Sequence, residues 1–307
     1  MSLATIISEL EAVRNRPSLF EETELGQRAA AIDFLHYAAG TIRAFERSHG
    51  ATPETRELLE QATDLERDLR NVDRQFFAAV RGQIRSGKLT GSRLRAFCNR
   101  FTGYEPRDEV HLHLSLDPLD ILVTGVLHPT QPPQPTHRLA PDMVAYQPSP
   151  ASALLELVDR VQMRSNDVFY DLGSGLGAVV ILANLLTGVQ ARGVEIDPGL
   201  CDYGRGAAEA LSLAGVAFIN ADVRAADLSD GTIFYLFTPF MGKLLAEAMA
   251  RLQGIAQHHR IRIGTYGPMT PIVAGLPWLR SLNMHHEDPF RLAVFESRET
   301  TGAGYAP

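Results

Sequence analysis

The sequence predicts an α/β protein in which a doubly wound, mostly parallel β-sheet follows an α-helical N-terminal region. Three observations predict this class. A short apolar run, Val168–Leu172, is typical of a buried parallel strand. Three glycines and an apolar run at helical spacing, Ala178–Leu186, follow it directly. Further short apolar runs come later, separated by segments long enough for helices, as in repeated βαβ units.

The first hundred residues show helical periodicity. Apolar side chains recur at steps of three or four over Leu3–Val13 and over Ile32–Phe45, and Gly50 ends the second stretch. Thr52 and Pro53 predict the N-cap and first position of a long helix. Its apolar seam runs from Leu58 to Val80. We expect this seam to pack within the N-terminal domain, with a homodimer contact through these helices as the alternative.

The next segments lead from this helical region to the sheet. Ser86-Gly87 ends the long helix, and another is expected from Thr90 to Arg100. Residues 109–117 alternate polar and apolar side chains, which predicts a short strand near 110–116. Its two histidines have zinc-ligand spacing but no nearby third ligand, so we expect a strand with a polar face and no metal site.

A proline-rich stretch gives the expected domain boundary. Asp117-Pro118 predicts the start of a short apolar helix that ends at Leu127. Residues 129–139 then contain four prolines among polar residues, which is typical of a stiff, extended linker. We therefore expect a mainly helical domain over residues 1–128, this linker, and an α/β domain over residues 140–298.

Composition and charge limit the functional classes. The chain has 307 residues and a net charge of −7, which argues against general affinity for nucleic acid. Basic residues crowd the span between Asp73 and Asp108, which holds a single acid, Glu105; we interpret it as a solvated helical face, with docking of an acidic or phosphate-bearing substrate as the alternative. Two cysteines, no signal peptide and no stretch of membrane length favour a cytoplasmic protein.

The glycine-rich segment after the first strand is the first candidate ligand site. It joins a strand to a helix through Gly173, Ser174, Gly175 and Gly177. Glycines let the backbone approach a ligand, and the free N–H groups at the following helix start point toward it. This pattern suits two ligand classes, dinucleotides and S-adenosylmethionine. Asp171, two residues before the first glycine, favours the second, because a carboxylate there would repel a pyrophosphate.

Acids also follow the next two expected strands. Ala191–Asp197 predicts a strand that ends near Glu195 and Ile196, and Glu195 can accept hydrogen bonds from both hydroxyls of a ribose. Val216–Asn220 predicts the next strand, followed by Asp222 and Val223. Asp222 can accept from an exocyclic adenine amine. Since strand ends meet at one edge of a parallel sheet, the three acids are expected to share one site.

These motifs resemble those of the class I S-adenosylmethionine-dependent methyltransferases over roughly residues 140–298. The resemblance rests on Asp-Leu-Gly-Ser-Gly-Leu-Gly at 171–177, Gly-Val-Glu-Ile-Asp at 193–197 and Asn-Ala-Asp-Val at 220–223. It implies a seven-stranded sheet with a reversed last strand and S-adenosylmethionine as cofactor. It also implies that Asp171 and the glycine turn hold the methionine end, Glu195 the ribose and Asp222 the adenine. The same segments are similar to those of non-SET histone lysine methyltransferases, which is weak evidence for a protein acceptor.

Two loops are expected to complete the site. Tyr146 and Gln147 precede the helix that leads to the glycine turn, and Tyr146 is our candidate lid over the cofactor sulfonium. Packing of Tyr146 in a structural turn is the alternative. Phe237 and Thr238 end the strand Thr232–Phe237 and are expected to line the cofactor and methyl channel. Amino-methyltransferases of nucleic acids resemble one another in having Asp or Asn where this chain has Phe237, so amino methylation of adenine or cytosine is in doubt.

The C-terminal part completes the expected sheet. A helix over Lys243–Leu252 and a strand over Arg260–Thr265 precede a closing hairpin formed by 278–286 and 290–297. Residues 299–307 have the composition of a disordered tail. The paired histidines at 258–259 and 285–286 could supply a base, although solvated histidines are the favoured interpretation.

The sequence leaves the acceptor open. We expect methyl transfer to an unidentified small molecule or protein, with no assigned catalytic residue beyond the weak candidates Tyr146 and Thr238. A non-catalytic methyltransferase-like binding protein is one alternative. An NAD-dependent oxidoreductase is a second, less favoured one, because the glycine turn with Ala178 also satisfies the dinucleotide pattern.

Overall fold

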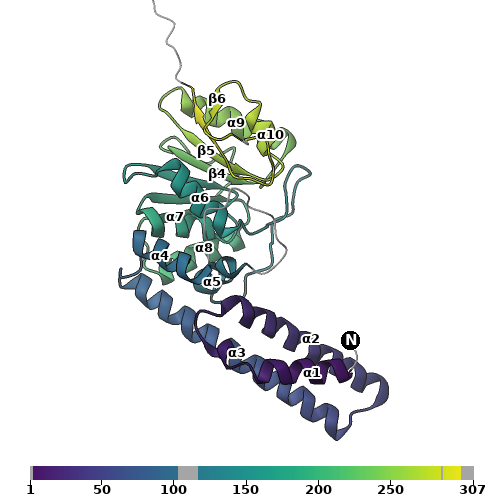
Figure 1. Cartoon of the computed structure of the whole chain (residues 1–307). Helices are drawn as coiled ribbons and strands as arrows, with labels where there is room; N and C mark the ends of the chain where they lie inside the picture. Colours follow the sequence, from purple (N-terminus) through teal and green to yellow (C-terminus); the bar gives the residue numbers. More distant parts are fainter. Residues whose placement is uncertain (1–2, 103–116, 285, 299–307) are drawn as a thin grey trace, which may run out of the picture.

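The structure, a computed structural model, describes residues 3–102, 117–284 and 286–298. The strand expected near 110–116 and the tail expected at 299–307 lie outside the described residues. An N-terminal group of helices leads into a seven-stranded sheet that is covered by helices on both faces (Figure 1). The predicted fold class is therefore confirmed.

Three N-terminal helices form an antiparallel arm that extends away from the sheet (Figure 1). They are α1 (Leu3–Arg14), α2 (Leu25–His49) and α3 (Pro53–Arg85), with a short 3₁₀ turn (Pro17–Phe20) after α1. Thr52 caps α3 as predicted: its hydroxyl accepts from the N–H of Thr55, and the Thr55 hydroxyl accepts from the N–H of Thr52. The arm has a core of its own, built around residues such as Leu35 and Leu69.

The end of α3 and two further helices connect the arm to the sheet. These are α4 (Gly91–Thr102) and α5 (Pro118–Leu127), both close to the predicted bounds. Phe76, Val80 and Ile84 of α3 belong to the same buried cluster as the residues of α5 and α7. The arm is therefore continuous with one face of the α/β core, because α3 takes part in both cores.

The sheet has the strand order β3-β2-β1-β4-β5-β7-β6, with β7 antiparallel to both neighbours. Its strands are β1 (Val168–Leu172), β2 (Gln190–Glu195), β3 (Val216–Asn220), β4 (Ile233–Phe237), β5 (Arg262–Tyr266), β6 (Leu279–Ser281) and β7 (Ala293–Ser297). The expected reversed last strand is thus confirmed. Strand order reverses between β1 and β4, which is the position where open α/β sheets bind ligands.

Helices cover the two faces of the sheet and form two buried clusters. One cluster contains side chains of α6 (Ala151–Val161), α7 (Ala178–Thr187) and α8 (Pro198–Ala210). The other contains side chains of α9 (Gly242–Ala256) and α10 (Thr270–Ala274). Helices α8 and α10 were not predicted from the sequence. Helix α10 has only five residues, too few for a periodic apolar pattern.

No helix among the described residues has both the length and the apolar character needed to cross a bilayer.

Candidate functional site

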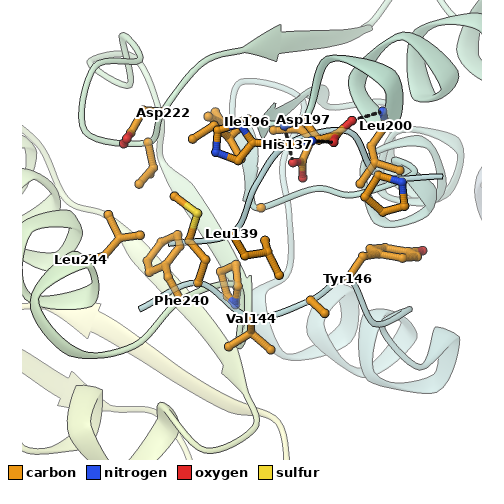
Figure 2. Close-up of a pocket in the computed structure, with 18 of the residues that line it drawn as sticks. His137, Leu139, Val144, Tyr146, Ile196, Asp197, Leu200, Asp222, Phe240 and Leu244 are labelled. Carbon is orange, nitrogen blue, oxygen red and sulfur yellow. Dashed lines mark hydrogen bonds between the residues drawn. The ribbon is translucent and has the colours of Figure 1, made fainter. Parts of the chain in front are cut away.

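A pocket of about 220 Å³ opens at the carboxyl ends of β1, β2 and β4 (Figure 2). Nine residues that were expected from sequence line it: Tyr146, Gln147, Gly173, Glu195, Ile196, Asp222, Val223, Phe237 and Thr238. The other four expected residues, Asp171, Ser174, Gly175 and Gly177, do not line the pocket themselves and lie in β1 and the turn that follows it. The fold therefore brings all thirteen to one edge of the sheet.

The glycine turn has a shape that other residues would not adopt readily. Gly175 has a φ of 52°, in the left-handed region, and a Cβ atom placed there would lie 2.1 Å from the ring of Tyr146. Gly173 has a φ of 87°, and a Cβ atom there would lie 2.3 Å from Pro239. Glycine at these two positions lets Tyr146 and Pro239 approach the turn closely.

Glu195 fastens the glycine turn to the end of β2. One carboxylate oxygen, Oε2, accepts a hydrogen bond from the N–H of Gly175 at 2.8 Å, and Oε1 accepts from the N–H of Asp197 at 2.8 Å. The side chain is buried yet reaches the pocket surface. Each carboxylate oxygen can accept a second donor, so Glu195 can still accept from two hydroxyl groups of a ligand.

Asp171 is a buried carboxylate without a hydrogen-bond partner among the described residues. It is 4% exposed and lies in the same row of the sheet as Gly193 and Tyr235. Burial is the larger cause and the nearby negative charge of Glu195 the smaller one, and together they raise its pKa to about 8. A buried carboxylate of this kind is costly unless a cation joins it.

Tyr146 lies over this region of the turn. Its ring contacts the position of Gly175, and its side chain is partly exposed to the pocket. Burial raises the pKa of its hydroxyl to about 12, and the negative charges of Asp171 and Glu195 act in the same direction. The phenol therefore remains protonated at neutral pH and presents an aromatic face and a hydrogen-bond donor.

At the other end of the pocket, Asp222 is already ion-paired. Arg224 donates to its Oδ2 at 2.6 Å, and the backbone N–H of Arg224 donates to Oδ1 at 2.8 Å. These hydrogen bonds lower the pKa of Asp222, so it stays ionised. Asn220 donates to the carbonyl oxygens of Glu195 and Ile196 and so fixes the end of β2. The contacts of Asn220 and Arg224 were not predicted from the sequence, because such side-chain hydrogen bonds leave no periodic signal.

A segment that was expected to be partly linker forms one wall of the pocket. We call residues 135–147 the strap; it lines the pocket with Pro135, His137, Leu139, Met143, Val144, Ala145, Tyr146 and Gln147. Apart from one isolated β-bridge, between Met143 and Phe240, it has no regular secondary structure. Asp197 at the start of α8 binds it through backbone hydrogen bonds. The Asp197-Pro198 pair is a helix-start signal that could have identified Asp197 from sequence.

The end of β4 brings Phe237 and Thr238 to the pocket, as expected. Thr238 has a φ of 44°, which is rare for a β-branched residue, and its hydroxyl donates to the carbonyl oxygen of Tyr266 at 3.1 Å. The rings of Phe237 and Tyr266 pack with centroids 5.3 Å apart. The strained turn that follows β4 is held by β5.

The paired histidines do not line the pocket among the described residues. A ring nitrogen of His259 lies 2.9 Å from the carbonyl oxygen of Gly231, and one of His286 lies 3.1 Å from that of Asn283. His285 lies outside the described residues. Within the part of the chain that the structure describes, no group of three or more His, Cys, Asp or Glu side chains has the arrangement of a metal site.

One protein family matches a segment of the chain that forms part of this site. Residues 145–220 match the protein family described as histone methylation protein DOT1. This segment begins in the strap and ends with β3, so it contains the glycine turn and Glu195. No curated protein matches the sequence.

Many solved structures are similar to part of the chain. An RNA methyltransferase from Salinibacter ruber in complex with S-adenosyl-L-homocysteine has 24% identity and a TM-score of 0.38, covering 49% of this chain and 92% of that one. Precorrin-6y C5,15-methyltransferase from Geobacter metallireducens has 14% identity and a TM-score of 0.38, covering 52% and 92%. An S-adenosylmethionine-dependent methyltransferase from Thiobacillus denitrificans in complex with S-adenosyl-L-homocysteine has 20% identity and a TM-score of 0.33, covering 39% and 50%. The fold assignment itself rests on the strand order and the reversed β7.

Proposed function

We propose that this chain, which has the class I S-adenosylmethionine-dependent methyltransferase fold, binds S-adenosylmethionine in the pocket at the ends of β1, β2 and β4 and transfers its methyl group to an acceptor. One observation carries the proposal. Behind a glycine turn lies a buried carboxylate, Asp171, with no hydrogen-bond partner among the described residues, and Glu195 stands beside it. A cationic ligand fits this pair of carboxylates, whereas a pyrophosphate does not.

The residues present suit the parts of this cofactor. Asp171 and Tyr146 would hold the positively charged methionine end, through charge pairing and an aromatic face. Glu195 would accept hydrogen bonds from the ribose hydroxyls with the lone pairs that Gly175 and Asp197 leave free. Asp222, Val223 and Ile196 would hold the adenine.

In the mechanism that we propose, the cofactor supplies an activated methyl group on a sulfonium. The chain's own residues position and enclose the reactants. Glu195 fixes the glycine turn, and the ring of Tyr146 packs over this turn. The strap excludes water from one side of the pocket. Alignment of two reactants can contribute roughly 7 to 11 kcal/mol to the lowering of the barrier. Phe237 and Thr238 would border the side on which the acceptor enters, and no general base is assigned.

The acceptor is a protein or a small molecule. The description of the matched family, histone methylation, favours a lysine side chain of a protein. However, the match ends at residue 220, before Phe237 and Thr238, so it supports the donor side of the reaction more than the acceptor side. Transfer of labelled methyl from S-adenosylmethionine to histones, to other proteins or to a small-molecule extract would distinguish these acceptors.

We also propose the division into residues 1–128, 129–139 and 140–298. The separate core of α1–α3 supports a helical domain. Helices α4 and α5 share a buried cluster with α7 and so attach this helical domain to the α/β part. The non-catalytic alternative would bind the cofactor with no transfer to any acceptor.

Calorimetric titration with S-adenosylmethionine tests the core proposal. We expect binding by the wild type and strongly weakened binding after Glu195→Ala or Asp171→Ala. Undiminished binding by both variants would contradict the assigned roles. Protection from thermal unfolding by NAD but not by S-adenosylhomocysteine would instead favour an oxidoreductase.

A further inference from the structure

The strap forms one side of the pocket, and two anchors hold it there. Its first part brings His137 beside Ile196, and its second part brings Val144 beside Phe240 (Figure 2). Because the strap has almost no regular secondary structure, backbone ladders cannot fix its position. The anchors must therefore come from contacts with the α/β core.

The first anchor is the carboxylate of Asp197, which performs two tasks. Its Oδ1 accepts from the N–H of Leu200 at 3.1 Å and so caps α8. Its Oδ2 accepts from the backbone N–H groups of Thr136 and His137, the latter at 2.6 Å, and from the hydroxyl of Thr136 at 3.3 Å. Asp197 is 3% exposed, so these hydrogen bonds are largely shielded from water. Figure 2 shows Asp197 between the strap and the start of α8.

The second anchor ties the other half of the strap to the start of α9. Asp142 accepts from the backbone N–H of Lys243 through Oδ2 at 3.0 Å, and its carbonyl oxygen accepts from the N–H of Met241 at 2.8 Å. The N–H of Val144 donates to the carbonyl oxygen of Pro239 at 3.1 Å. This anchor includes several backbone hydrogen bonds, whereas the first depends on a single side chain.

We propose that Asp197 is a positioning residue that holds the strap over the pocket and thereby slows release of the bound nucleoside. The inference rests on the proposed function, because the nucleoside is S-adenosylmethionine or its product S-adenosylhomocysteine. Asp197 sits two residues after Glu195, and its own N–H donates to Glu195. One short segment thus joins the ribose-binding carboxylate, the cap of α8 and the strap.

The substitution Asp197→Asn separates capping from strap binding. Asparagine is a good N-cap, so its single carbonyl oxygen can still cap α8. Its amide nitrogen is only a donor, and it would face the N–H groups of Thr136 and His137 where the carboxylate oxygen accepted from them. The variant should therefore keep α8 and release the strap.

Asp117→Asn is a matched control. Asp117 also caps a helix immediately before a proline, accepting from the N–H of Leu119 at 2.8 Å, and it does not line the pocket. We would measure amide hydrogen exchange at Thr136 and His137 without ligand, and the dissociation rate of S-adenosylhomocysteine, in the full chain. We expect fast exchange and an about tenfold faster dissociation only in Asp197→Asn, a change that corresponds to about 1.4 kcal/mol.

The outcomes separate the two proposals. If Thr136 and His137 exchange equally slowly in wild type and Asp197→Asn, or if dissociation is unchanged while exchange is fast, Asp197 does not position the strap for ligand retention. If the wild type binds no S-adenosylhomocysteine, the proposed function is wrong, and so is retention of this nucleoside by the strap. A lowered melting temperature in Asp197→Asn but not Asp117→Asn, with unchanged dissociation, would indicate a purely structural role.

Discussion

The carboxylate of Glu195 accepts a hydrogen bond from the backbone N–H of Gly175 at 2.8 Å, across the boundary between the end of β2 and the glycine turn. This contact couples the residue expected to bind the ribose to the turn expected to hold the methionine end. One side chain therefore shapes the two halves of the pocket, and a change at Glu195 should affect both.

Glu195→Gln tests this coupling. We expect S-adenosylhomocysteine to bind roughly 10- to 100-fold more weakly, because hydrogen bonds to a charged group contribute about 1.5 to 3 kcal/mol and the amide can accept at only one of its two positions. Isothermal titration calorimetry measures the change. Glu209→Gln, a substitution at an exposed residue of α8 that does not line the pocket, should bind like the wild type. Equal affinities of Glu195→Gln and wild type would contradict the assigned role.

Gly175→Ala tests the close approach of Tyr146. The new Cβ atom would add strain at a φ of 52° and would also collide with the tyrosine ring. Gly188→Ala is the control, since Gly188 has a φ of 75° but open space around its Cβ position. We expect Gly188→Ala to lower the free energy of unfolding by about 1 to 2 kcal/mol, the cost of left-handed backbone alone. Gly175→Ala should cost more, and the difference should shrink when Tyr146 is also replaced by Ala.

Thr238 gives a test of the turn after β4. Thr238→Val keeps the shape of the side chain but removes the hydroxyl that donates to Tyr266, so the free energy of unfolding should fall by about 1 kcal/mol. Thr238→Ser retains the hydroxyl and should be close to the wild type. Urea denaturation with tryptophan fluorescence from Trp278 measures both. If valine and serine have the same effect, the hydrogen bond does not hold the turn.

Much of the fold was predictable because local patterns and tertiary structure agree. The strand Val168–Leu172 and the helices that begin at Pro53 and Pro118 have the predicted bounds, since apolar periodicity and capping residues act over a few positions. Residues 129–139 show the opposite case. Proline content predicts an extended linker there, but periodicity cannot show that Asp197, some sixty positions later, holds this chain against the pocket.

The same limit applies to the candidate site. Acids at strand ends could be found from sequence, because parallel topology brings strand ends together. The partners of these acids could not. The pairing of Arg224 with Asp222 depends on the conformation of a single loop. The left-handed turn at Thr238 and the burial of Asp171 depend on neighbours that lie far apart in sequence.

Asp171→Asn should stabilise the protein and weaken ligand binding, with opposite dependences on pH. Its pKa is raised from 3.8 to about 8 by burial and by Glu195. Between pH 3.8 and about pH 8, Asp171 therefore keeps its proton in the folded state but has released it in the unfolded state. The contribution of Asp171 to stability is present below the unfolded pKa and is lost as the pH rises through about 8.

The stability advantage of Asp171→Asn should consequently grow between pH 6 and pH 8, to about 1 to 3 kcal/mol in urea denaturation without ligand. Affinity for S-adenosylmethionine should change in the opposite sense: the wild type should bind more tightly at pH 8 than at pH 6, because only the ionised carboxylate pairs with the cationic ligand. The variant should bind at least about tenfold more weakly at pH 8 and show a flatter profile. Asp202→Asn, an exposed substitution in α8, should follow the wild type in both measurements. Two results together would contradict this prediction: a wild-type affinity that does not rise with pH, and no stability gain in Asp171→Asn. They would show that burial does not destabilise the ionised carboxylate of Asp171 and that this carboxylate does not bind a cation.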